Sequence, residues 1–166
     1  MKSRKLAFLG LLIALAFVLS YIEFMLPINI GIPGAKVGLA NLVVVVALYT
    51  LGERDAFTLS IIRVLLVGLT FGNMAMMMYS AAGAALSFIA MFTAKRTGKL
   101  SQTGVSVIGG VFHNVGQIVV AMFVLETSAI FYYLPFLIIV GTLSGVIIGF
   151  VSGMIITRVK KIFRWV

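Results

Sequence analysis

The chain has 166 residues, of which 62% are hydrophobic and 10% charged, and its formal net charge is +9. Soluble domains carry about 25% charged residues, so the composition excludes a soluble globular protein and predicts an all-α membrane protein with a single domain over residues 1–166. The basic residues stand in short clusters between apolar stretches rather than along one face, a pattern that argues against a nucleic-acid partner.

Six apolar stretches suggest a bundle of six transmembrane helices. Crossing the hydrocarbon core takes about 20 apolar residues, and fewer where a segment is buried inside a bundle. The second stretch is short, which fits a helix entered from a loop that folds back into the protein. We expect helices at residues 6–26, 37–51, 54–71, 74–94, 104–125 and 130–158.

The positions of Lys and Arg predict the orientation of this bundle. Basic residues at helix ends are retained on the cytoplasmic side. With six alternating spans, all of them except Lys36 and Arg63 fall on one side, together with both termini. We therefore expect cytoplasmic termini in a multi-pass protein of the bacterial plasma membrane, with Phe131, Tyr132 and Tyr133 in an interfacial belt on the opposite side.

The segment from residue 23 to residue 41 interrupts the helical pattern. It contains Pro27, Pro33 and three glycines, which disfavour a continuous helix. Irregular backbone at membrane depth is tolerated only against protein or a watery cavity. We interpret the segment as the lid of a binding site on the external side, and the alternative is a plain external connector.

Arg63 is predicted to lie near the middle of the helix at residues 54–71. A central Arg costs at least about 2.5 to 3.5 kcal/mol to insert, so its side chain should face the bundle interior and a partner. Two interpretations remain open. Arg63 either contacts an anionic substrate or forms a structural ion pair with Glu23 or a bond to a helix-end carbonyl.

The helix at residues 104–125 carries the densest polar cluster of any predicted span, formed by His113, Asn114 and Gln117. Their spacings of three and four place them on a similar side. They either contact a ligand or form hydrogen bonds between helices. With no second His, no Cys and four acids in the chain, the sequence favours neither a metal site nor a catalytic residue.

Small residues recur every fourth position in several predicted helices. The stripe of Gly141, Gly145, Gly149 and Gly153 indicates close helix packing. Similar spacings occur in the first and fourth helices, where internal contact and partner docking remain open. A methionine cluster at residues 74–78 either fills gaps or contacts a ligand.

The run LPINIGIPGAKVGLANLVVVVALYTLGERDAF, followed by the Arg63 helix and by GVFHNVGQ, resembles the Gx transporter family, also labelled heptaprenyl diphosphate synthase component I. The resemblance covers residues 6–153. This family is similar to the substrate-binding S components of energy-coupling factor (ECF) transporters. That resemblance implies a six-helix subunit that captures a vitamin or an isoprenoid or cofactor precursor and works with a transmembrane scaffold subunit and two ABC ATPases.

S components commonly dock through small residues of the first helix, and the matching positions here are Gly10 and Ala14. The chain lacks a phosphate-binding Gly-x-x-x-x-Gly-Lys-Ser/Thr loop, so the energy for transport must come from a partner. No cofactor is expected. The ligand is expected to be small and anionic or zwitterionic, with substrate-binding residues Glu23, Asn29, Lys36, Asn41, Arg63, Asn73, Tyr79, His113, Asn114 and Gln117.

The family label also suggests a second function, a membrane subunit that anchors or regulates a prenyl diphosphate synthase. Such synthases bind magnesium diphosphate through aspartate-rich DDxxD motifs. This chain has a single aspartate, Asp55, and therefore cannot supply the several carboxylates that bridging magnesium ions need. The protein is expected not to be an enzyme.

Overall fold

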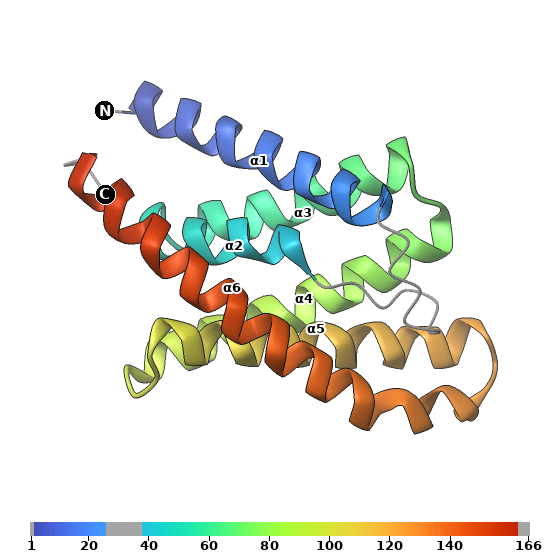
Figure 1. Cartoon of the computed structure of the whole chain (residues 1–166). Helices are drawn as coiled ribbons and strands as arrows, with labels where there is room; N and C mark the ends of the chain where they lie inside the picture. Colours follow the sequence, from blue (N-terminus) through green and yellow to red (C-terminus); the bar gives the residue numbers. More distant parts are fainter. Residues whose placement is uncertain (1, 26–37, 163–166) are drawn as a thin grey trace.

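The computed structural model describes residues 2–25 and 38–162, and every regular element in this part of the chain is a helix (Figure 1). The all-α prediction is confirmed, and each predicted helix overlaps one of the six long helices. The elements are α1 (Lys2–Met25), α2 (Leu39–Thr50), α3 (Glu53–Thr70), α4 (Met74–Thr97), α5 (Gln102–Val124), the 3-10 helix η1 (Ser128–Tyr133) and α6 (Leu134–Ile162).

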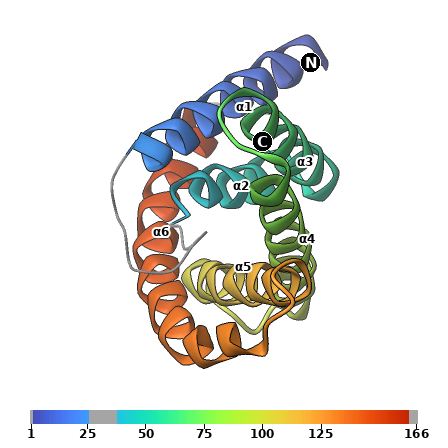
Figure 2. The same cartoon turned by 90° about the vertical axis from the view of Figure 1, so that its right-hand side faces the viewer.

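Helix α2 lies at the centre of the hydrophobic core. Its residues 43–48 are all buried, and the helix packs against α1, α3, α5 and α6 (Figure 2). A helix that is apolar on all sides is stable only when protein surrounds it. Its 12 residues extend about 18 Å, less than the roughly 30 Å of a hydrocarbon core. The prediction of a short second helix is confirmed.

Within residues 2–25 and 38–162, four helices are long and apolar enough to cross a membrane: Ser3–Met25, Met74–Thr97, Gln102–Val124 and Ser128–Ile162. Helix α3 has 18 residues but carries charges at Glu53, Arg54, Asp55 and Arg63. The outer surface is strongly apolar, with Leu69 78% and Phe123 79% exposed. A surface of this kind is suited to lipid rather than to water.

Capping residues explain where the observed helix ends differ from the predicted ones. The Ser101 hydroxyl accepts a hydrogen bond from the Gly104 amide, so α5 begins at Gln102 rather than at Gly104. Helix α4 continues through its basic last turn until Gly98 takes a left-handed conformation. At residue 130 the chain forms a 3-10 helix, and regular α-helix starts only at Leu134, just before Pro135.

Glycines bring α5 and α6 into direct backbone contact. A Cβ added at Gly145 would lie 2.6 Å from Val107 Cα, and one added at Gly149 would lie 2.7 Å from Thr103 Cα. Gly141 faces Gly110 in the same way. The packing interpretation of the glycine stripe is therefore confirmed for these three positions. At Gly153 the nearest atoms are 3.6 Å away or more, an ordinary contact.

Aromatic rings hold the second half of α1 against the end of α3. The Phe71 ring lies 5.2 to 5.4 Å from the rings of Phe17, Tyr21 and Phe24. Ring pairs at this separation stabilise a contact by about 0.5 to 1.5 kcal/mol beyond the area they bury. This packing brings the C-terminal end of α1 close to the polar interior.

Candidate functional site

Two adjoining cavities lie among the helices, and polar side chains line both of them. The first is bordered by residues of α2, α4, α5 and α6, and the second by residues of α1, α3, α4 and α5. Gly38 and His113 line both cavities, so the two spaces meet at these residues. The described helices therefore converge on one polar region inside an apolar protein.

Arg63 extends from α3 into the second cavity. Its side chain lines the cavity together with Glu23 and His113, and the residue is 7% exposed. Its Nε atom is buried and has no hydrogen-bond partner among the described residues. A buried cation whose donors are not fully used is costly, because desolvation is not offset by hydrogen bonds. The expectation that Arg63 faces the interior is confirmed.

Glu23 connects the end of α1 to the start of α2. Its carboxylate accepts a hydrogen bond from the Gly38 amide, and Gly38 has the left-handed φ of 82° that favours glycine. An anion at the N-terminus of a helix is stabilised by the exposed amides there. Glu23 also interacts electrostatically with Arg63. The carboxylate therefore has a structural role as well as a place in the cavity wall.

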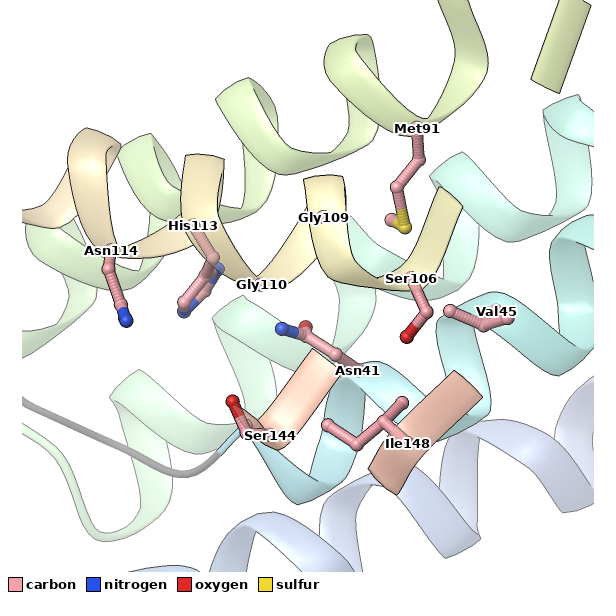
Figure 3. A pocket seen from close by; sticks show the side chains of 11 residues that line it. Asn41, Val45, Met91, Ser106, Gly109, Gly110, His113, Asn114, Ser144 and Ile148 are labelled. Atoms are coloured by element: carbon pink, nitrogen blue, oxygen red, sulfur yellow. The ribbon is translucent and has the colours of Figure 1, made fainter. Parts of the chain in front are cut away.

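The first cavity is lined by short polar side chains from three helices. Asn41 comes from α2, Ser106 and His113 from α5, and Ser144 from α6 (Figure 3). All four residues are buried, and His113 is 5% exposed. Amide, hydroxyl and imidazole groups can each donate or accept hydrogen bonds, so this cavity can bind a polar group of either kind.

The other two residues of the predicted α5 cluster contact neighbouring helices. Asn114 lines the first cavity but donates a 2.8 Å hydrogen bond to the Leu137 carbonyl of α6. Gln117 packs against α4, where a Cβ at Gly83 would lie 2.9 Å from its Cγ. Hydrogen bonding between helices therefore accounts for Asn114, whereas His113 lies between the two cavities.

Two further predicted site residues, Asn73 and Tyr79, do not line these cavities. Asn73 is exposed and caps α4, since its side chain accepts a 2.8 Å hydrogen bond from the Met76 amide. Tyr79 is half-buried and lines neither cavity. Asn29 and Lys36, with most of the expected lid, lie outside the described residues.

Sequence reasoning missed several residues that line the cavities. Ser106 lies seven residues before His113, so helical periodicity extended back from the polar cluster would have found it. Ser20, Ser80 and Ser144 are single serines in apolar helices and carry no comparable signal. Their hydroxyl groups bond to backbone carbonyls in many helices without any ligand.

Both cavities are narrow. Their volumes are about 10 and 20 Å³, enough for a water molecule, whereas pockets for small molecules are typically about 300 to 1,000 Å³. Within the described residues, no group of three or more His, Cys, Asp or Glu side chains gathers to hold a metal ion. The described residues therefore form a compact polar region with little free space between the helices.

The model of the family described as heptaprenyl diphosphate synthase component I matches residues 12–155. The chain belongs to this family. No curated protein and no solved structure matches this chain. This family is the Gx transporter family that the sequence resembles. The matched span includes Glu23, Arg63 and His113, so the polar region lies within the part of the chain that matches the family.

Proposed function

We propose that this protein is the substrate-binding S component of an ECF-type ABC importer and that it captures a small anionic ligand from outside the cell. The buried Arg63 side chain carries the proposal, because its guanidinium lines a cavity and its Nε has no hydrogen-bond partner among the described residues. Charged groups inside a membrane bundle typically mark a substrate or ion pathway. A carboxylate or phosphate would supply the acceptors that a guanidinium needs.

The narrow cavities imply that binding is coupled to a change of shape. An anion at Arg63 would compete with Glu23 for the guanidinium and would repel the Glu23 carboxylate. Glu23 holds α1 to the first amide of α2 through Gly38, so weakening that contact gives α1 a route to move away. Ligand entry therefore rearranges the α1 side of the second cavity in this proposal.

The proposed orientation has both termini in the cytoplasm and six membrane passes, with the short helix α2 crossing inside the bundle. The chain has no cysteine, so single introduced cysteines can be labelled one at a time. Lys99→Cys and Thr127→Cys flank α5 at opposite ends, and both positions are exposed. A membrane-impermeant maleimide added to whole cells should label Thr127→Cys and not Lys99→Cys, and the reverse pattern would refute this orientation.

Partner docking is assigned to the outer face of α1. Gly10 has no heavy atom within 4 Å of the position a Cβ would take, and Ala14 is exposed. In contrast to Gly141, Gly145 and Gly149 of α6, Gly10 is not occupied by an internal contact. A transmembrane scaffold helix could approach closely at this face.

Co-purification tests the proposal. The tagged protein is expressed with an ECF scaffold subunit and its two ATPases, and the purified material is analysed by native mass spectrometry. The expected result is a four-protein complex and a small ligand released on denaturation. Absence of both the complex and any bound ligand would refute the proposal.

A second function has a specific observation in its favour. The family description names a synthase component, and one end of the bundle carries paired charges that a soluble enzyme can reach. Lys5 Nζ lies 2.5 Å from Asp55 Oδ2, and Arg96 Nη2 lies 3.3 Å from Glu53 Oε2. An anchoring subunit would depend on residues 52–55 and 95–99, whereas a transport subunit depends on Arg63.

A further inference from the structure

An apolar groove runs between α3 and α4 on the outer surface. Its volume is about 290 Å³, close to the lower limit of about 300 Å³ for small-molecule pockets. The α3 side contributes Phe57, Ser60, Ile61, Val64 and Leu65, and the α4 side contributes Ala81, Ala84 and Ala85.

The groove exists because α4 presents alanines where α3 presents larger side chains. Alanine ends at Cβ, so the space between the two helices is left unfilled. Beyond the groove the helices meet again at both ends. The rings of Phe57 and Phe88 lie 5.1 Å apart at one end, and at the other a Cβ on Gly68 would lie 2.8 Å from Met77.

Val64 separates this groove from the polar cavity. Its side chain lines both spaces and is buried. On α4, Ser80 lines the cavity and the next residue, Ala81, lines the groove. The cavity that Arg63 lines and the apolar groove are therefore adjacent, with Val64 in the wall of both.

We propose that the ligand of this site is an amphiphilic anion, whose charged head binds at Arg63 and whose apolar chain lies in the groove between α3 and α4. This inference rests on the proposed function and specifies its substrate class. The charge of Arg63 fits a phosphate or carboxylate head, and the wall of alanines and branched apolar side chains fits a hydrocarbon chain. The contacts that close both ends of the groove limit the chain to a short length.

Alkyl phosphates of increasing length test the proposal. Butyl, hexyl and octyl phosphate are titrated against the full chain in phosphatidylcholine nanodiscs, and binding is followed by phosphorus NMR. Each methylene buried in the groove can raise affinity by up to about fourfold. The variants are Arg63→Gln for the head, Ala81→Leu and Ala85→Leu for the groove, and Ala7→Leu as a matched control on the exposed face of α1.

The expected result is affinity that rises with chain length in the wild type and in Ala7→Leu. In Ala81→Leu and Ala85→Leu, butyl phosphate should bind within about twofold of the wild type, while octyl phosphate loses at least about tenfold because leucine fills the groove. An octyl phosphate carrying a terminal photoreactive diazirine should label α3 and α4 in the wild type, which tests the groove without any substitution.

Two other outcomes separate this inference from the proposed function. In the first outcome, binding depends on Arg63, but affinity rises with chain length equally in the groove variants and in Ala7→Leu, and the diazirine labels residues away from α3 and α4. This result would place the hydrocarbon chain in bulk lipid and refute the inference alone. No binding that depends on Arg63, at any chain length, would refute the anion site and the inference together.

Discussion

Arg63 and His113 line the same cavity, although their helices, α3 and α5, do not pack against each other anywhere in the described part of the chain. Ser20 and Glu23 of α1 and Ser80 of α4 also line this space. A structural ion pair needs only two neighbouring helices. Convergence of polar groups from four helices is more than an ion pair needs, and a few convergent polar groups are typical of ligand pockets.

Replacing Arg63 by methionine should weaken ligand binding without destabilising the ligand-free protein. Loss of charge-assisted hydrogen bonds corresponds to a decrease in affinity of about tenfold to a hundredfold. Removing the buried charge also removes its desolvation cost, and Glu23 keeps its bond to the Gly38 amide when Arg63 is lost. The ligand-free variant should therefore unfold close to the wild-type temperature. A variant that binds ligand normally but unfolds at a lower temperature would instead assign Arg63 a purely structural role.

Glu23 variants separate the two roles of that carboxylate. Glu23→Gln keeps an oxygen that can accept the bond from Gly38 but removes the negative charge near Arg63, so affinity for an anionic ligand should increase. Glu23→Ala removes the acceptor as well and should lower the thermal unfolding temperature. Titration calorimetry and thermal unfolding of both variants measure the two effects. Decreased anion affinity in Glu23→Gln would contradict the competition between Glu23 and the ligand.

Adding a methyl group to α6 where it contacts α5 should destabilise the protein at Gly145 but not at Gly153. Gly145→Ala places a Cβ 2.6 Å from Val107 Cα, and overpacking of this kind costs about 1 to 3 kcal/mol. Gly153→Ala is the matched control, because its Cβ meets nothing closer than 3.6 Å. Thermal unfolding should show a lower midpoint for the first variant and an unchanged or higher one for the second. Equal midpoints would mean that the two helices pack differently.

Lys95 should stabilise the end of the central helix. Its Nζ donates a 2.8 Å hydrogen bond to the Leu48 carbonyl in the last turn of α2, where a positive charge is favoured. Lys95→Met should reduce the free energy of unfolding by about 1 kcal/mol. Lys99→Met, at an exposed position after α4, should have no measurable effect. Two variants of equal stability would show that the bond to Leu48 contributes nothing.

The α1 face should control assembly and leave ligand binding intact. Ala14→Trp places a large ring on an exposed surface and should prevent co-purification with the scaffold subunit. Ala129→Trp makes the same substitution at an exposed position within η1 and should leave assembly unchanged. Affinity chromatography measures assembly, and calorimetry measures ligand binding. Normal assembly of Ala14→Trp would move the docking surface elsewhere.

Much of the fold is predictable, because the length of each apolar stretch and the residues that interrupt helices act locally. The short, uniformly apolar run of α2 indicates burial, and the spacing of His113 and Asn114 from Gln117 indicates a polar helix face. The difference at the start of α5 comes from Ser101, a capping signal that is itself local and readable from the sequence.

The site is less predictable, because it depends on which helix faces meet. The sequence does not show that Asn114 bonds to Leu137 while His113 borders both cavities. The place of Val64 between the polar cavity and the apolar groove depends in the same way on the pairing of α3 with α4. The role of Asn73 is also hard to predict, because a polar side chain at the start of a helix can either cap the helix or bind a ligand.

Native mass spectrometry of the wild-type protein and of Arg63→Met, purified side by side from membranes, tests the central claim most directly. Our account predicts a small anionic ligand bound to the wild type and absent from the variant, with both proteins folded. An empty wild-type protein, or the same ligand retained by both proteins, would contradict it.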